Sequence, residues 1–370
     1  MIPAARRRLL FTAFSLRRGG AERVTTTLLR YLAALDRYDL HLALLEQEGP
    51  FLDLLPDCVT VHGIGTRRIV PSLSRMYRLL DGLRPDVVFS NGFPINLLTS
   101  SLKPFLRSSP RLVLREVNVL DVLLRRGLSR VVLRQVARRT FRSADAIICQ
   151  SKFMQDDLRA GLNLDPHKLV TIFNPVDFDA IAQLAGSANP FAGHGPGPHV
   201  VGVGYLARKK GFDRVLEAFP ALKARAPTAR LWLVGGGPEA ESLQRQAERL
   251  GLSECVTFVG PSDNPYVWMR HADLFVLASR HEGTPNVLLE AIACSAPIVV
   301  VDHPGGTREV MQRTGQEWRI VSDLSAWDQR WFERPPATVL ARARSFLDVS
   351  HVARQYLAVL DNAVQQREAA

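Results

Sequence analysis

The feature that most constrains the fold of this chain is a regular alternation of short apolar segments with longer amphipathic ones. Apolar runs such as residues 40–45, 87–90 and 298–301 are bounded by polar residues, a pattern typical of buried parallel strands. Segments with helical periodicity, such as residues 212–223, lie between these runs. Strands that alternate with helices predict parallel sheets covered on both faces. We therefore expect a doubly wound α/β protein.

A segment rich in Gly and Pro interrupts the alternation. Residues 186–198 contain no Lys, Arg, Asp or Glu, a composition typical of linkers. The alternation restarts at Val200, and a chain of 370 residues is too long for one ordinary core. We predict four parts: an N-terminal domain at 1–180, a linker at 181–199, a second domain at 200–348 and a last helix at 349–370.

The composition favours a cytoplasmic protein without a metal site. No apolar run approaches the ~18 residues that a membrane span needs, and residues 9–14 are too few for a signal peptide. The four cysteines are scattered and form no Cys-x-x-Cys pair. We expect free thiols, most of them buried, rather than disulfides or metal ligands.

The positive charge is concentrated in the N-terminal half. The formal net charge is +11, and residues 1–180 hold 27 Lys and Arg against 17 Asp and Glu. A localised basic face predicts an anionic partner, which leaves a membrane surface, a phosphorylated acceptor and nucleic acid as candidates.

The densest basic segment runs from Arg111 to Arg142 and contains nine arginines against two acids. Four of them recur every fourth residue and would line one face of a helix: Arg126, Arg130, Arg134 and Arg138. Apolar residues lie between them, so the segment suits a basic amphipathic helix on anionic lipid. A solvated outer helix with locally paired arginines is the alternative.

Two carboxylates mark the most informative motif. The apolar run 272–278 predicts a strand, and a loop and a helix follow it, with Glu282 in the loop and Glu290 in the helix. Ligands of open α/β sheets bind outside the carboxyl ends of the strands, which is where this loop would lie.

Other polar loops follow predicted strands in the same way. Gly19 and Gly20 open a helix after the first strand, where backbone N–H groups can approach an anion. Arg208, Lys209 and Lys210 lie beside a Gly-rich turn and suit a diphosphate. Further turns contain Gly235 and Pro261. Each could be a plain turn or a solvated loop, but together they indicate one binding edge.

Together these motifs resemble the retaining nucleotide-sugar glycosyltransferases of family 4, which have the GT-B fold of two Rossmann-like domains that face a central cleft. The resemblance covers most of the chain and is strongest from Gly202 to Glu309. Within it, Glu282-(x)7-Glu290 in a Ser-Arg-x-Glu-Gly context is specific. The Gly19-Gly-Ala-Glu-Arg motif and Asn174-Pro-Val-Asp also match the family.

The resemblance implies roles for individual residues. Glu282 would contact the donor sugar, Glu290 would hold the ribose hydroxyls, and Lys210 would bind the diphosphate together with Arg208 or Lys209. The remaining implied donor-binding residues are Gly19, Gly20, Tyr205, Gly235, Pro261, Gly283, Thr284, Pro285, Asn286 and Val287.

The chain departs from the family pattern at three places, one of which is the segment 315–336, which lacks the family's usual Gly-rich, Asp-containing end of the donor cleft. Tyr205 stands where the family usually has Arg, and Arg115-Glu-Val-Asn118 occupies a region where many members have His. We assign Arg115 and Asn118, with the arginines of the basic helix, to contacts with the acceptor or the membrane.

The function implied by the resemblance is sugar transfer from a nucleotide diphosphate sugar, with retention and without a metal or other cofactor. A UDP-sugar is the expected donor, and a glycan or lipid-linked molecule of polysaccharide or lipopolysaccharide synthesis is the expected acceptor. The enzyme would lie on the cytoplasmic face of the inner membrane, and its last helix would cross back to the N-terminal domain.

Three alternatives remain open at this point. A non-catalytic or partner-dependent GT-B scaffold is the first, and a nucleotide-sugar epimerase, disfavoured by the Glu-(x)7-Glu motif, is the second. A nucleic-acid-binding protein is the third, although the sequence has no helix-turn-helix, zinc or aromatic RNA-reading motif.

Overall fold

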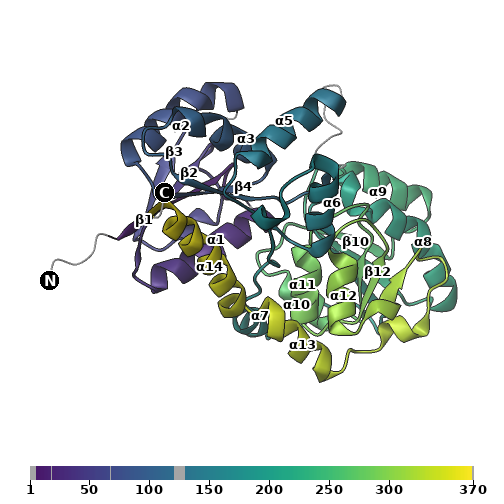
Figure 1. Ribbon diagram of the computed structural model, residues 1–370. Coiled ribbons are helices and arrows are strands. Elements are labelled where there is room, and N and C mark those ends of the chain that lie inside the picture. The colour runs from purple at the N-terminus through teal and green to yellow at the C-terminus, as the bar shows by residue number, and fades with distance from the viewer. Residues whose placement is uncertain (1–5, 18, 67, 121–129, 369–370) are drawn as a thin grey trace. The chain divides into compact units, whose positions relative to one another are not determined.

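The computed structural model describes residues 6–17, 19–66, 68–120 and 130–368. The chain divides into two compact units (Figure 1). The first unit consists of Met1–Pro175 and Val349–Ala370, and the second of Val176–Asp348.

The first unit is built on a seven-stranded parallel sheet of order β3-β2-β1-β4-β5-β6-β7. Its central strands are almost wholly buried, as expected for strands that are covered on both faces. The strands are β1 (Arg7–Ala13), β2 (Tyr38–Leu44), β3 (Val59–Gly63), β4 (Val87–Asn91), β5 (Arg111–Arg115), β6 (Ala146–Cys149) and β7 (Leu169–Thr171).

Helices cover both faces of this sheet and bury a separate core on each. One core contains side chains from α2, α3, α5 and α6, and the other contains side chains from α1 and α14. The α-helices are α1 (Gly20–Ala34), α2 (Ile69–Leu83), α3 (Phe93–Leu102), α5 (Arg130–Arg142), α6 (Lys152–Leu162) and α14 (Val349–Glu368). Short 3-10 turns are η1 (Leu52–Leu54), η2 (Lys103–Phe105) and η3 (Pro166–Lys168).

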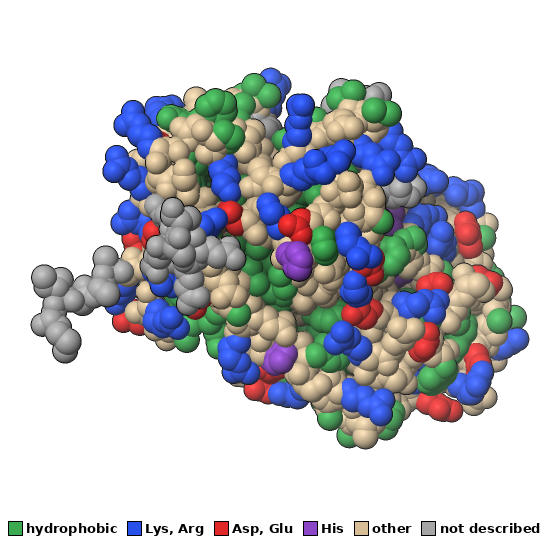
Figure 2. Space-filling view, viewed as in Figure 1, with side chains coloured by type: hydrophobic (Ala, Val, Ile, Leu, Met, Phe, Trp, Pro, Cys, Tyr) green, Lys and Arg blue, Asp and Glu red, His purple; other side chains and the backbone are tan. Residues whose placement is uncertain are grey.

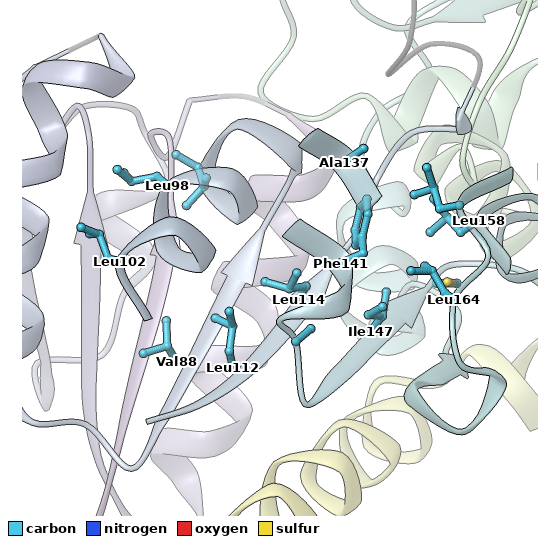
Figure 3. Close-up of a cluster of buried hydrophobic side chains, with 14 of the residues drawn as sticks. Val88, Leu98, Leu102, Leu112, Leu114, Ala137, Phe141, Ile147, Leu158 and Leu164 are labelled. Carbon is cyan, nitrogen blue, oxygen red and sulfur yellow. The ribbon is translucent and has the colours of Figure 1, made fainter. Parts of the chain in front are cut away.

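Figure 3 shows how α5 is fixed to the sheet. Phe141 and Ala137 of α5 lie among side chains of β5 and β6, including Leu114 and Ile147. Because these apolar side chains share one face of the helix, the polar and basic residues of α5 are left on the other face.

The second unit contains a six-stranded parallel sheet of order β10-β9-β8-β11-β12-β13. Its strands are β8 (His199–Val203), β9 (Arg230–Val234), β10 (Val256–Gly260), β11 (Leu274–Leu277), β12 (Ile298–Val301) and β13 (Ile320–Val321). Side chains of α8 and α9 form the core on one face, together with Trp327 and Trp331.

The remaining helices of the second unit contact one another in the series α7, α10, α11, α13 and α12. The α-helices of this unit are α7 (Phe178–Ala185), α8 (Phe212–Arg225), α9 (Ala240–Arg249), α10 (Tyr266–His271), α11 (Asn286–Ala293), α12 (Thr307–Thr314) and α13 (Ala337–Leu347). The 3-10 turns are η4 (Arg208–Lys210), η5 (Glu317–Arg319) and η6 (Gln329–Phe332). Two parallel sheets with interleaved helices confirm the doubly wound α/β prediction.

The expected linker at 181–199 is part of the second unit instead. Residues 178–185 form α7, which contacts α10 and α11. Phe191 is buried, with its ring stacked on that of His199 at 4.5 Å between centroids. Aromatic packing therefore fixes a segment whose composition resembles a linker, and the chain passes between the units at Pro175–Val176, earlier than we expected.

The last helix, α14, belongs to the first unit. Four buried residues of α14, Val352, Ala353, Tyr356 and Leu360, join the core that contains α1. Their helical spacing places them on one face, so α14 is held by apolar burial. Among the described residues, no helix is long and apolar enough to cross a membrane.

Candidate functional site

Strand order locates the candidate site of the second unit. β8 lies at the centre of the sheet, with β9 on one side and β11 on the other. The connection after β8 leads to β9 and the connection after β11 leads to β12, so the two run in opposite directions along the sheet. The crevice between two such connections is the usual ligand site of doubly wound folds. The loop after β8 contains η4 (Arg208–Lys210), and the loop after β11 contains Glu282.

The two loops meet through an ion pair. Lys210 Nζ donates to Glu282 Oε1 at 2.5 Å, although the residues are far apart in sequence. Ser279 Oγ donates to the same oxygen at 2.9 Å. The two charged side chains are only 14% and 10% exposed, respectively, so this is a largely buried pair. The structure thus brings two of the predicted site residues together.

The pair keeps Glu282 ionised. Burial alone would raise the pKa of this carboxyl, but the charges of Lys210 and Lys209 and the hydrogen bonds from Lys210 and Ser279 outweigh it. The pKa of Glu282 is therefore lowered. A carboxylate of this kind can accept hydrogen bonds from a ligand but is a poor proton donor at neutral pH.

Glycines allow the loops to approach closely. Gly211, at φ +69°, packs so near the Ala278 carbonyl that a Cβ would lie 1.9 Å from its oxygen. Gly305, at φ +137°, packs in the same way on the Glu282 carbonyl. A side chain at Gly211 would push the segment that carries Lys210 away from Ala278, and one at Gly305 would push the loop after β12 away from Glu282.

The segment between the two glutamates opens α11. Gly283, Thr284 and Pro285 are buried and precede the helix, and the Gly283 carbonyl accepts a hydrogen bond from Gly306 N at 2.6 Å. Asn286 and Val287, the first residues of α11, are half-buried, and Glu290 is buried on the next turn. The structure thus places Glu282 in the loop and Glu290 in the helix, as predicted.

The other predicted donor residues of this unit also follow strand ends. Tyr205, Arg208 and Lys209 follow β8 and are exposed. Gly235 follows β9, and its N–H donates to Gly260 O at 2.8 Å. Pro261 follows β10 and is exposed, so these residues lie at the carboxyl ends of three neighbouring strands.

His303 was missed by the sequence analysis. It lies two residues after the end of β12 and is buried, with Nδ1 2.8 Å from Val301 O and Nε2 2.9 Å from Thr307 Oγ1. Burial lowers its pKa, and the nearby Glu282 and Asp302 only partly oppose this shift. The imidazole is therefore neutral at pH 7. Its position close behind the apolar run 298–301 was the signal that could have revealed it.

In the first unit, Gly19 and Gly20 lie where the sequence placed them. Gly20 is the first residue of α1, and Gly19 O accepts from Arg23 N at 3.0 Å. β1 lies next to β4 at the point where the strand order reverses, so these glycines follow the switch-point strand of this sheet.

The assignment of Arg115 to a surface that contacts acceptor or membrane is wrong. Arg115 ends β5 and is fully buried. Its guanidinium donates to Tyr356 Oη at 3.0 Å, Asn91 Oδ1 at 2.8 Å and Asn174 Oδ1 at 2.6 Å. The side chain therefore points into the unit and connects α14 with the ends of β4 and β5.

Glu116, the next residue, is also fully buried. Its Oε1 accepts hydrogen bonds from the N–H groups of Val117 and Asn118, at 2.8 and 3.0 Å. Burial raises its pKa to about 7, although these bonds and the Arg115 charge oppose the shift. Glu116 thus shapes the loop that carries Asn118, which is half-buried.

The basic helix α5 presents arginines to solvent. Arg130 and Arg134 are exposed and Arg138 is half-buried, while Arg126 lies outside the described residues. Arg134 Nε donates to Gly161 O at 2.7 Å. Val131 and Val132 are 70% and 49% exposed, and Figure 2 shows many Lys and Arg side chains in the region of α5.

No group of three His, Cys, Asp or Glu side chains in the described ranges is arranged to hold a metal ion. The cationic side chains at the carboxyl ends of the strands, together with the Lys210–Glu282 ion pair, are therefore the groups that could bind a charged ligand here.

Comparison with known proteins identifies the family. Residues 18–180 match the model of Glycosyltransferase Family 4, and residues 197–329 match that of Glycosyl transferases group 1. The chain belongs to glycosyltransferase family 4. This enzyme is similar, at 28% identity over 80% of its chain and 81% of the relative, to the N-acetylgalactosamine-N,N'-diacetylbacillosaminyl-diphospho-undecaprenol 4-alpha-N-acetylgalactosaminyltransferase of Campylobacter jejuni.

A second relative is the GDP-mannose-dependent alpha-(1-6)-phosphatidylinositol monomannoside mannosyltransferase of Mycolicibacterium smegmatis, 33% identical over 49% of this chain and 50% of the relative. Among solved structures, Anabaena HepE in complex with UDP-glucose aligns with a TM-score of 0.79 at 20% identity, over 96% of this chain and 99% of that one. The fold is therefore GT-B, as predicted, and the family favours an enzyme over a non-catalytic scaffold.

Proposed function

We propose that this glycosyltransferase moves a sugar from a nucleotide diphosphate sugar to a glycan or lipid-linked acceptor, in the synthesis of a cell-surface polysaccharide or lipopolysaccharide. The observation that carries the proposal is the buried Lys210–Glu282 pair at the switch point of the second sheet, beside the start of α11. A cation, a carboxylate and a helix start at one edge suit the diphosphate and the hydroxyls of such a donor.

In the proposed reaction the anomeric configuration is retained. The bond from the anomeric carbon to the diphosphate breaks, and the acceptor oxygen bonds to the same face of the sugar. The acceptor proton passes to the leaving diphosphate, which departs as the nucleoside diphosphate. Lys210 stabilises the charge that grows on the diphosphate, and Arg208 or Lys209 assists it.

The other site residues position the donor. Glu282 accepts hydrogen bonds from sugar hydroxyls, a role that its lowered pKa favours. Glu290 holds the ribose, and the N–H groups at the start of α11 bind the sugar and diphosphate. We propose a UDP-sugar as the donor and no metal, because cationic side chains can neutralise the diphosphate. In support, the Anabaena neighbour is a complex with UDP-glucose.

We propose that donor binding also involves the loops at the other strand ends. Tyr205, Gly235 and Pro261 follow β8, β9 and β10, and we assign the border of the base to Pro261. Gly19 and Gly20 of the first unit would offer backbone N–H groups to the diphosphate.

We further propose that α5 brings the enzyme to the cytoplasmic face of the inner membrane. Exposed arginines and the exposed Val131 and Val132 on α5 suit an anionic lipid surface, where each cation contributes about 1 kcal/mol. In support, the Campylobacter relative is named for an undecaprenol-linked acceptor. Sedimentation with anionic vesicles tests this: we expect salt-sensitive binding that Arg130→Glu with Arg134→Glu weakens, and no binding would refute it.

A donor screen tests the main proposal. The protein is incubated with UDP-, GDP- and ADP-sugars, and thermal shift and slow donor hydrolysis are measured. We expect one donor to stabilise the protein and to be hydrolysed, and Glu290→Ala to abolish both effects. Glu248→Ala, which changes an exposed carboxylate on α9, is the matched control. If no donor or free nucleotide stabilises the protein, the scaffold alternative replaces this proposal.

A further inference from the structure

Arg280 lies two residues before Glu282 and forms a two-point ion pair with Asp213. Arg280 Nη1 donates to Asp213 Oδ1 at 2.8 Å, and Nη2 donates to Oδ2 at 2.5 Å. Asp213 lies in the first turn of α8, directly after η4. The pair therefore connects the loop after β11 to the helix that follows Lys210, and its geometry is specific to a guanidinium.

The same residue also holds the backbone of η4. Arg280 Nη1 donates to Arg208 O at 2.7 Å, and Arg280 N donates to Lys209 O at 2.7 Å. A single residue thus fixes the backbone just before Lys210 and the helix just after it. These contacts anchor the loop from which the Lys210 ammonium reaches Glu282.

The positive charge of Arg280 is already paired with the carboxylate of Asp213 within the protein. Burial opposes ionisation of Asp213, but the hydrogen bond and charge of Arg280 outweigh it and lower the pKa of Asp213. The hydrogen bond from Arg280 to Asp213 in turn raises the pKa of Arg280. The two side chains are 25% and 33% exposed, so the pair lies toward the outside of the loop while Lys210 lies inside it.

We propose that Arg280 is a positioning residue that sets the place of Lys210 and does not itself touch the donor. This inference rests on the proposed function, because it assumes that Lys210 stabilises the leaving diphosphate. A displacement of a positioned group by about 1 Å can lower turnover on the order of 10²-fold. Asp213 is the partner through which Arg280 acts on the helix side of the loop.

The test is a kinetic cycle between Arg280→Ala and Lys210→Ala. We expect Arg280→Ala alone to lower kcat on the order of 10²-fold, with a smaller change in the KM for the donor. In the Lys210→Ala background, the same change should lower kcat by roughly twofold or less, because residues that act as a unit are not additive. Equal fold losses in both backgrounds would overturn the proposal.

Three further variants separate positioning from a general structural role. Asp213→Asn should lower kcat as Arg280→Ala does, and Arg280→Lys should lower it less, because lysine keeps the charge but not the two-point geometry. Arg225→Ala is the matched control: Arg225 Nη1 donates to Trp327 O at 2.6 Å from the other end of α8, away from η4. It should leave kcat unchanged, and a loss equal to that of Arg280→Ala would contradict a specific role.

A measurement without substrate distinguishes failure of this inference from failure of the proposed function. Trypsin cleaves after Lys and Arg, so the bonds after Arg208, Lys209 and Lys210 report how firmly η4 is held. We expect cleavage there to be faster in Arg280→Ala than in the wild type or in Arg225→Ala. Unchanged cleavage would overturn the inference. If the wild type turns over no donor, the proposed function fails, and the cleavage result still decides whether Arg280 holds the loop.

Discussion

The Lys210–Glu282 pair can be tested by removing its charges one at a time and together. Lys210→Met leaves the Glu282 carboxylate buried with Ser279 as its remaining hydrogen-bond donor and Lys209 as a more distant charge. Removing one partner of a buried ion pair lowers the free energy of unfolding by ~3–5 kcal/mol. The contacts that remain around Glu282 favour the lower end of this range. We therefore expect the free energy of unfolding of the second unit to fall by about 3 kcal/mol.

The double variant, Lys210→Met with Glu282→Gln, removes both charges. Replacement of a whole buried ion pair by neutral groups of similar size is often nearly neutral, so we expect stability within about 1 kcal/mol of the wild type. Activity should nevertheless be lost, because the charges are the proposed functional groups. The double variant thus separates the stability of the loops from their chemistry.

Tryptophan fluorescence during urea unfolding measures the stability of the second unit in each of these variants. All five tryptophans lie in the second unit, namely Trp232, Trp268, Trp318, Trp327 and Trp331. At ~2 kcal/mol per molar urea, a loss of ~3 kcal/mol lowers the midpoint by about 1.5 M in the single variant. If the double variant is destabilised by the sum of the single effects, the pair does not form in solution and the reasoning is wrong.

The pH dependence of the same cycle provides a second check. In the wild type, the lowered pKa of Glu282 means that this group contributes stability above its ordinary pKa and loses it as the pH falls. In Lys210→Met the dominant remaining effect is burial, which raises the pKa. The destabilisation by Lys210→Met should therefore shrink as the pH falls from 8 to 5, and a constant difference would contradict this.

Two further predictions concern the first unit. Tyr356→Phe leaves Arg115 Nε without its acceptor, so hydrogen exchange of α14 amides should become roughly 10- to 100-fold faster. Tyr38→Phe is the control. It removes a hydrogen bond to Asp361, but Asp361 still pairs with Arg7 and Arg37, so exchange should change less. Glu116 has a pKa raised to about 7, so its contribution to stability is full below its ordinary pKa of 4.5 and is lost as the pH rises through 7. Glu116→Gln should therefore gain stability relative to the wild type between pH 5 and pH 8, as followed by circular dichroism, and a pH-independent difference would contradict this.

Periodicity and spacing predicted much of the fold. The apolar runs predicted the parallel strands because buried strands require them, and the position of Glu282 after a strand placed it at the binding edge. The linker prediction failed because composition does not reveal that Phe191 stacks on His199. Arg115 was misplaced because nothing near it in the sequence shows that it is buried. The amide and phenol oxygens that accept its hydrogen bonds come from distant parts of the chain.

Pairings between loops were the other part that the sequence could not supply. Lys210 and Glu282 were each predicted to be site residues, but their contact depends on the strand order β8-β11, which is set by the packing of the whole unit. The roles of Arg280 and Asp213 were hidden for the same reason. Arg280 lies within the Ser-Arg-x-Glu-Gly motif and Asp213 within the predicted helical segment 212–223, and only the folded loops show that they pair.

The most direct test of the central claim is sugar transfer by a variant of Lys210. Transfer of a labelled sugar from the donor found in the screen to a polyprenyl diphosphate-linked glycan is measured at saturating donor. We predict turnover by the wild type, a loss of roughly 10²–10³-fold in Lys210→Ala, and no loss in Lys223→Ala, which changes a lysine of α8 that donates to Pro227 O. Near-normal turnover by Lys210→Ala would contradict the account.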